Sequence, residues 1–141
     1  MSVKILVPVD GSPTTAHTVE AIIAQRQRFT APLVLLHVVD IDRLAYRMIP
    51  DFQLEMVREH ARRAGENLLL LQAEKFHLAG LATTTRLEFG APREVIPRIA
   101  NDETFHLLII GRRRQGELRD VLFGSVANHV LHHVSCPVLL I

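Results

Sequence analysis

The chain has 141 residues, of which 48% are hydrophobic and 22% are charged, and its formal net charge is +1. This composition is typical of a globular protein and excludes a disordered chain. The near-neutral charge argues against nucleic-acid and membrane-surface binding, and no apolar run approaches the ~20 residues of a membrane span. We therefore expect one domain over residues 1–141. The lone cysteine, Cys136, and the absence of a signal-peptide pattern favour a cytoplasmic location.

The first third of the chain predicts two buried strands around one helix. Val3–Val9 is a short apolar run rich in branched residues, which is typical of a buried strand. Ser12 supplies a capping hydroxyl, and proline follows at the first helical position. This helix is expected to run to about Phe29, with Val19, Ile22, Ile23 and Phe29 facing inward. Pro32–Val39 predicts the second buried strand.

A long helix is predicted in the middle of the chain, after a loop over residues 40–50. It covers Asp51–Ala79, and Gly80 is a plausible C-terminal cap. Apolar residues recur at spacings of three and four, which indicates one inward face. That expected inner face consists of Leu54, Val57, Ala61, Ala64, Leu68 and Leu71.

The remaining elements continue the alternation of strands and helices. Strands are predicted at Thr83–Phe89, His106–Ile110 and Cys136–Ile141, and helices at Pro92–Asn101 and Gly124–Val134. The order βαβαβαβαβ predicts an α/β fold: a doubly wound, five-stranded parallel sheet with helices on both faces. Ligands of such sheets bind beyond the carboxyl ends of the strands, where the strand order reverses.

Two loops carry residues suited to phosphate. Asp10-Gly11-Ser12 follows the first strand, and a long connection from Gly111 to Phe123 leads to Gly124-Ser125 at a helix start. Unpaired N–H groups and the helix dipole favour an anion at such a start. A sheet order that reverses between the first and fourth strands would bring both loops to one crevice. The sequence therefore suggests a nucleotide site.

Six motifs, in order along the whole chain, resemble the universal stress protein family. They are Val7–Ser12, Leu35–Val38, Gly90–Pro92, Ile109–Gly111, Leu122–Val126 and Cys136–Leu139. The resemblance implies an adenine nucleotide alpha-hydrolase-like sheet of order 3-2-1-4-5. It also implies a homodimer formed through the last strand, and binding of ATP or AMP, possibly with Mg²⁺. The expected role is that of a stress-response regulator or sensor without robust catalysis, acting on protein partners that the sequence does not name.

The resemblance also implies roles for individual residues. Asp10 would bind the ribose hydroxyls, Val38 would present its backbone to the adenine edge, and Ile110 would pack on the base. Gly111, Gly124, Ser125 and Val126 would offer groups to the phosphates. The implied lining of the crevice is completed by Pro8 and Val9.

Arg114 departs from the family pattern. ATP-binding members carry a glycine, two residues, a second glycine, nine residues, and then Gly-Ser or Gly-Thr. Here Gly111 and Gly124-Ser125 fit, whereas Arg114 occupies the place of the second glycine. Its side chain either closes the crevice or, with Arg113, clamps phosphate oxygens. A closed crevice would leave a dimeric interaction module that binds no nucleotide.

Simpler interpretations stand beside these. Ser125 could merely cap its helix by bonding to the Asn128 amide. A nucleotide-using enzyme is a further alternative, although the sequence contains no Walker-type loop and no nucleophile elbow. The spacing of His129, His132, His133 and Cys136 resembles a metal site, but all four crowd one short helix end, so we expect no structural metal.

The last strand predicts a contact with a second copy. Pro137, Val138, Leu139 and Leu140 form an apolar, uncharged run. At the edge of a sheet, such a strand exposes unpaired backbone groups to a partner. His37 lies within a buried strand and is expected to be a hydrogen-bonded core histidine.

Overall fold

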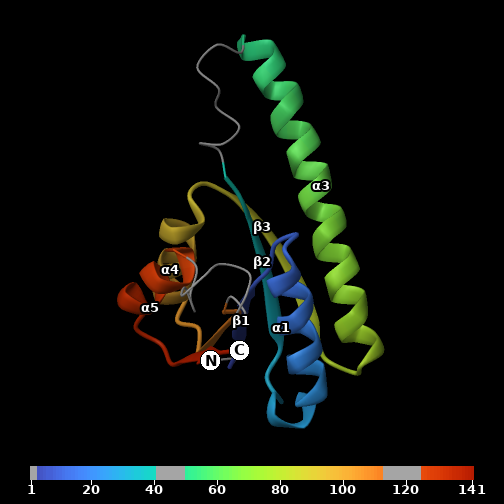
Figure 1. The fold of residues 1–141 in the computed structure, drawn as a ribbon, viewed down its shortest axis with the longest axis vertical. Helices are drawn as coiled ribbons and strands as arrows, with labels where there is room; N and C mark the ends of the chain where they lie inside the picture. The colour runs from blue at the N-terminus through green and yellow to red at the C-terminus, as the bar shows by residue number, and fades with distance from the viewer. Residues whose placement is uncertain (1–2, 41–49, 113–124) are drawn as a thin grey trace.

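The computed structural model describes residues 3–40, 50–112 and 125–141, and it shows an all-parallel sheet between two layers of helices (Figure 1). Within these ranges the sheet has five strands in the order β3-β2-β1-β4-β5, as predicted. The strands are β1 (Ile5–Pro8), β2 (Leu33–Val39), β3 (Thr83–Phe89), β4 (Leu107–Ile110) and β5 (Val138–Leu140). The helices are α1 (Pro13–Ala24), the 3₁₀ turn η1 (Arg26–Arg28), α3 (Asp51–Leu78), α4 (Pro92–Asp102) and α5 (Ser125–His133).

Both faces of the sheet are apolar, because successive side chains of a strand point to opposite sides. On one face α1 and α3 cover a cluster that includes Val7, Leu35 and Phe76. On the other face α4 and α5 cover a cluster that includes Leu6 and Leu36. The central strands are therefore buried on both sides, and their polar backbone groups are accessible only where the strands end.

The first helix ends earlier than predicted. Its α-helical part stops at Ala24, and the tighter turn η1 follows it. Because of this turn, Phe29 still reaches the core, where only 8% of its surface is exposed. The expected capping role of Ser12 is wrong: Ser12 is the N-cap residue, but its hydroxyl makes no cap hydrogen bond.

The prediction for the inner face of α3 is wrong, because the buried face lies at a different angle around the helix. Leu71 is 54% exposed, and Ala64 is exposed as well. The first half of α3 extends beyond the sheet (Figure 1), so only the second half is packed against the core. The half-buried members of the predicted face are Leu54, Val57, Ala61 and Leu68. The buried residues are Gly65, Leu69, Gln72, Ala73 and Phe76.

Gly65 explains this rotation, because it allows α3 to lie close against the sheet. A Cβ atom at Gly65 would lie 2.6 Å from Leu87 Cδ1 and 2.9 Å from His37 Cδ2. The helix ends at Gly80 as predicted: its φ is +84°, and the Leu81 amide donates to the Phe76 carbonyl over 3.0 Å. This is a Schellman arrangement, which favours glycine.

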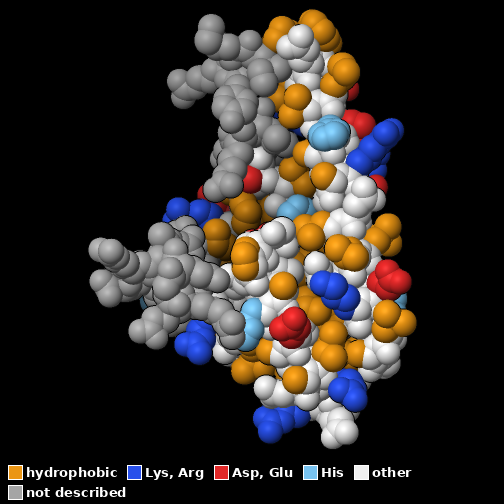
Figure 2. Space-filling model, turned by 45° about the vertical axis from the view of Figure 1, so that its right-hand side comes forward, with side chains coloured by type: hydrophobic (Ala, Val, Ile, Leu, Met, Phe, Trp, Pro, Cys, Tyr) orange, Lys and Arg blue, Asp and Glu red, His pale blue; other side chains and the backbone are white. Residues whose placement is uncertain are grey.

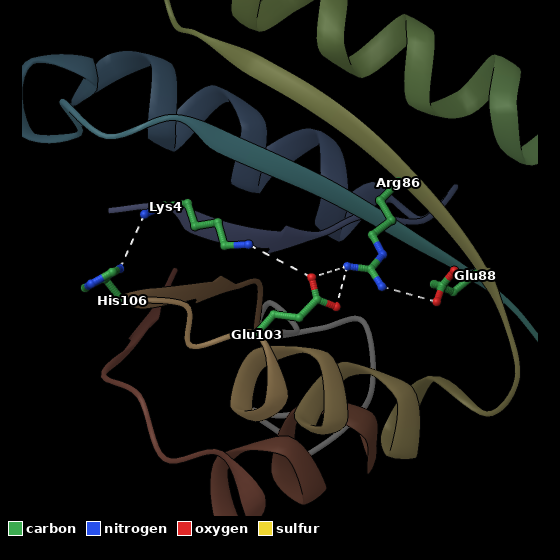
Figure 3. Close-up of polar contacts among 5 residues, drawn as sticks. All are labelled: Lys4, Arg86, Glu88, Glu103 and His106. Atoms are coloured by element: carbon green, nitrogen blue, oxygen red, sulfur yellow. Dashed lines mark hydrogen bonds and ion pairs between the residues drawn. The ribbon is translucent and has the colours of Figure 1, made fainter. Parts of the chain in front are cut away.

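A polar network occupies the part of β3 that α4 leaves uncovered. Figure 3 shows Glu103, at the end of α4, between Arg86 of β3 and Lys4. One guanidinium nitrogen of Arg86, Nη1, lies 2.6 and 2.5 Å from the two carboxylate oxygens of Glu103. Lys4 Nζ lies 3.9 Å from the same carboxylate and 4.4 Å from the centre of the Phe105 ring. The network therefore ties the edge strand β3 to α4 and to the start of β1.

The other predicted boundaries differ from the structure by one or two residues. The N-terminal strand is shorter because Val3, which is 51% exposed, lies outside it. Within the described ranges, no helix combines the length and the apolar character needed to cross a membrane.

Candidate functional site

The strand order reverses between β1 and β4, which lie at the centre of the sheet. The two strands pair in parallel, with Leu6 beside Leu108. From β1 the sheet continues to β2, and from β4 it continues to β5. The carboxyl ends of β1 and β4 are therefore the place where a doubly wound sheet offers its crevice. As predicted, five candidate site residues lie at these strand ends: β1 ends at Pro8 and is followed by Val9 and Asp10, and β4 ends at Ile110 and is followed by Gly111.

Asp10 anchors the turn that leads from β1 into α1. Its Oδ1 atom accepts hydrogen bonds from the Ser12 amide over 2.8 Å and from the Thr15 hydroxyl over 2.9 Å. The Ser12 hydroxyl donates to the same oxygen. Among the described residues, no hydrogen bond reaches Oδ2 of Asp10. One carboxylate oxygen therefore holds the turn, and the described residues leave the other without a hydrogen bond.

The environment keeps the Asp10 carboxylate ionised. Desolvation by neighbouring atoms raises its pKa, but hydrogen bonds from Ser12 and Thr15 and the nearby His37 together outweigh this effect. The net result is a pKa below the ordinary value of 3.8. At neutral pH, Asp10 is therefore a negatively charged hydrogen-bond acceptor.

Thr15 is a site residue that the sequence interpretation missed. Besides donating to Asp10, its Oγ1 atom accepts a hydrogen bond from the Asp10 amide over 2.8 Å. Thr15 is only 6% exposed. The available signal was a polar residue on the inward side of the first turn of α1. A hydroxyl is not expected there unless it has a partner.

The pairing of β1 with β2 ends at this turn. The Val9 amide still donates to the Leu36 carbonyl over 2.8 Å, but the register stops there. The Val9 carbonyl lies 2.9 Å from Nδ1 of His37, which can only donate to it. This confirms the predicted hydrogen bond of His37, although the residue is half-buried and belongs to neither core cluster.

The backbone of Val38 is left open as a result. Backbone groups alternate along a parallel strand, so Val38 faces the same side as Leu36. In a continued ladder the Val38 amide would donate to the Val9 carbonyl, but this carbonyl faces Nδ1 of His37 instead, and among the described residues no backbone hydrogen bond joins Val38 to the β1 side. The side chain of Val38 is buried in the α4–α5 cluster. The adenine contact that the family resemblance implies for the backbone of Val38, near the carboxyl end of β2, stays a prediction.

The end of β4 lies close against α1. A Cβ atom at Gly111 would lie 2.3 Å from Thr18 Oγ1 and 2.6 Å from Thr14 Cγ2. Glycine is therefore required here by close packing. The preceding Ile110 is 6% exposed and belongs to the α4–α5 cluster. The end of β4 and the first turns of α1, which follows β1, therefore lie in direct contact.

Two further predicted site residues, Ser125 and Val126, lie in the first turn of α5. This helix begins at Ser125, and Val126 is half-buried against the α4–α5 cluster. Three predicted positions, Arg113, Arg114 and Gly124, lie outside the described residues. The alternative role of Ser125 as a side-chain cap likewise lies outside the described part of the structure.

The histidines of α5 contact one another and α4. The rings of His129 and His133 stack with their centres 4.0 Å apart, and Arg93 Nη2 lies 3.3 Å from Nδ1 of His129. Desolvation, followed by the charges of His133 and Arg93, lowers the pKa of His129. Within the described residues, no group of three or more His, Cys, Asp or Glu side chains could hold a metal ion. Burial raises the pKa of the Cys136 thiol, which is half-buried.

The predicted dimer strand lies at the edge of the sheet. β5 pairs with β4 on one side, with Leu108 beside Val138 and Ile110 beside Leu140. In the described sheet, no strand lies on its other side. Pro137 precedes the strand, and its carbonyl accepts a hydrogen bond from the Leu108 amide over 3.0 Å.

Comparison with known proteins shows a likeness over the full length. The universal stress protein family model matches residues 1–141. The universal stress protein Sll1388 of Synechocystis is 26% identical over 98% of this chain and 96% of its own length. A universal stress protein family structure from Burkholderia pseudomallei has a TM-score of 0.74 at 26% identity, covering 98% of this chain and 94% of that one. The structure of MJ0577 has a TM-score of 0.80 at 26% identity, and the match covers 100% of this chain and 96% of that one.

Some structures with this fold contain an adenine nucleotide. A universal stress protein family structure from Arabidopsis thaliana has AMP bound (TM-score 0.71, 20% identity). One from Archaeoglobus fulgidus is a complex with dAMP (TM-score 0.69, 17% identity). Another universal stress protein is a complex with cAMP (TM-score 0.66, 18% identity). At these identities the likeness is one of fold alone.

The packing of Gly111 gives a first prediction. Replacing it with alanine (Gly111→Ala) should lower the free energy of unfolding by roughly 1–3 kcal/mol, because the short threonine side chains cannot make room for a methyl group. Gly11→Ala is the matched control, since a Cβ atom at Gly11 would meet nothing within 4 Å. Urea unfolding measures both. Equal effects of the two substitutions would contradict the close approach of β4 to α1.

The ionisation of Asp10 gives a second prediction. A carboxyl whose pKa is lowered by folding adds stability above its unfolded pKa and loses it as the pH falls through its folded pKa. The stability difference between the parent and Asp10→Asn should therefore be constant from pH 7 to about 5 and should shrink towards pH 3. Urea unfolding at a series of pH values measures it. A difference that does not change with pH would show that the Asp10 charge does not stabilise this turn.

Proposed function

Because the chain belongs to the universal stress protein family, we propose that it binds an adenine nucleotide, ATP or AMP, at the carboxyl ends of β1 and β4. It acts as a cytoplasmic stress-response regulator or sensor, and its output passes through protein partners. Support for the ligand class comes from three structures of the same fold, which contain AMP, dAMP and cAMP.

The single observation that carries this proposal is the arrangement around Asp10. Its Oδ1 atom is held by Ser12 and Thr15, which fixes the carboxylate in place. Its Oδ2 atom has no hydrogen-bond partner among the described residues. An ionised carboxylate accepts hydrogen bonds from hydroxyl groups, and a ribose presents two of these side by side. Asp10 therefore suits the sugar of a nucleotide.

The groups around Asp10 suit the other parts of the ligand. The open backbone of Val38 provides an N–H and a carbonyl, which match the donor and acceptor on an adenine edge, and Ile110 offers apolar surface beside it. Pro8 and Val9 line the crevice. Phosphates would lie against Gly111, Gly124, Ser125 and Val126, because the N-terminus of α5 favours an anion. Mg²⁺ would accompany ATP as a complex with its phosphates.

Arg113 and Arg114 decide between this function and an alternative. As planar donors, they are suited to phosphate oxygens, and we propose that they contact the phosphates. The alternative is a dimeric interaction module, which Arg114 favours because it replaces a glycine of the family motif. A side chain at that position could fill the space of the ligand. Neither function requires turnover of the nucleotide, and we propose at most slow ATP hydrolysis.

We also propose that two copies associate through β5. Its free edge and the apolar residues Val138, Leu139 and Leu140 would continue the sheet into a second copy. Pro137 is placed before the strand, so its missing N–H group does not interrupt the edge. A two-fold axis would pair the same strand from each copy.

Calorimetric titration with AMP and with ATP and Mg²⁺ tests the nucleotide site. The parent should bind at least one of them, and Asp10→Ala should weaken binding at least tenfold by removing the acceptor for the ribose. Asp102→Ala is the matched control, because Asp102 ends α4 just before β4 begins and so lies toward the amino ends of the strands, away from the crevice. Circular dichroism verifies that the variants fold.

A second variant distinguishes the two functions. If the parent binds neither nucleotide and Arg114→Gly gains binding, Arg114 closes the site and the interaction module is correct. If Arg114→Gly binds more weakly than the parent, the arginine is a phosphate contact. Absence of binding in both proteins would contradict a nucleotide site in this crevice.

Sedimentation tests the proposed dimer. Val138→Lys places a charge on the strand at the interface, and we expect the dimer to dissociate at least tenfold more readily. Thr84→Lys is the matched control, because it adds the same charge to an exposed residue of the opposite edge strand, β3. An unchanged dimer in Val138→Lys would exclude β5 as the interface.

A further inference from the structure

The first half of α3 carries large apolar side chains that nothing in the described structure covers. Phe52 is 68% exposed and Met56 is 70% exposed. Figure 2 shows hydrophobic side chains at the top of the molecule, over the beginning of α3, with charged side chains just below them. Further along the helix, Leu70 is 63% exposed. Exposed apolar residues that gather on one helix face indicate an interaction surface.

These residues belong to one regular stripe, which we call the outer stripe. It consists of Phe52, Met56, Glu59, Arg63, Glu66 and Leu70. The spacings alternate between four and three residues, as in the seam of a two-helix coiled coil, but the middle positions here are charged where a seam is apolar. The stripe lies about a third of a turn around α3 from its buried residues, of which Leu69 and Phe76 contact the core. Its members are exposed except Glu59, which is half-buried.

The charges of the outer stripe select a partner. Glu59 is paired within its own helix with Arg62 and Arg63, and Arg62 Nη1 lies 2.7 Å from Glu66 Oε1. In a parallel pairing with a second copy, Glu59 would face Glu59 and Arg63 would face Arg63. In an antiparallel pairing centred on residue 61, Glu59 faces Arg63 of the other copy. The same register places Phe52 opposite Leu70 and Met56 opposite Glu66, so the outermost apolar residues of the two stripes meet.

We propose that the outer stripe of α3 associates with the same stripe of a second copy, in antiparallel orientation. This surface goes beyond the proposed function, since it is separate from both the crevice and β5. Two whole stripes, with their charged members included, would bury on the order of 1,000 Å², which is the lower limit of a specific interface. The association is therefore weak and depends on concentration. A chain that pairs through both β5 and α3 would form assemblies larger than a dimer.

Disulfide cross-linking tests the orientation. Phe52→Cys and Leu70→Cys are combined in a Cys136→Ser background. Within one chain, the two positions are separated by about 27 Å of helix, so a disulfide between them can only join two copies. The antiparallel register predicts cross-linked dimers for this variant and few for Phe52→Cys alone, because residue 52 would not face residue 52. Equal cross-linking of the two variants, or none in either, would overturn the proposal.

Charge exchange tests the pairing of the stripe without cysteines. All variants carry Val138→Lys, which weakens any contact through β5. Sedimentation of these variants therefore reports on the α3 contact and does not depend on the proposed β5 dimer. Arg63→Glu should weaken association at least fivefold, and adding Glu59→Arg should restore it, because the double change keeps opposite charges face to face. Arg58→Glu, on the same half of α3 but outside the stripe, is the control and should have no effect. A double variant as weak as Arg63→Glu alone would contradict the antiparallel register.

Discussion

The rest of the site depends on the early end of β1. β1 ends at Pro8 while β2 continues to Val39, because the Val9 carbonyl faces Nδ1 of His37 and the Asp10 amide donates to the Thr15 hydroxyl. These two local contacts have two consequences. The first leaves the Val38 amide without its ladder partner, and the second helps to hold the Asp10 carboxylate, whose Oδ2 atom has no hydrogen bond among the described residues. Local hydrogen bonds thus produce the polar edge of a crevice in a sheet that is otherwise apolar on both faces.

The second constraint is the distance between β4 and α1. Gly111 allows the end of β4 to lie against Thr14 and Thr18. The two central strands are already neighbours in the sheet, and this approach places the start of α1 directly against the end of β4. Gly111 therefore has a structural role whether or not its N–H group contacts a phosphate. The first glycine of a phosphate-binding motif is explained here by packing alone, so its presence is weak evidence for a ligand, and the arrangement of Asp10 is stronger evidence.

The strand and helix order could be predicted from the sequence, because buried parallel strands such as Leu33–Val39 are continuous apolar runs. The rotation of α3 could not, because Gly65 sets it through contacts with His37 and Leu87, which are distant in the sequence. The part of α3 beyond the sheet also has apolar residues that mimic a core-facing pattern. The positions of Asp10, Val38 and Gly111 were predicted through the family resemblance. Thr15 was missed, because its role depends on a turn whose geometry the sequence does not specify. The predictions for Arg113, Arg114 and Gly124 lie outside the described residues.

The central claim is that an adenine nucleotide occupies the space between the Asp10 turn, Val38 and the start of α5. A ¹H–¹⁵N NMR titration with AMP tests this most directly, because it reports on each amide separately. We expect saturable shifts concentrated at Asp10–Thr15, Val38, Gly111 and the first turn of α5. Shifts confined to other parts of the chain, or no shifts at millimolar AMP and ATP, would contradict the account.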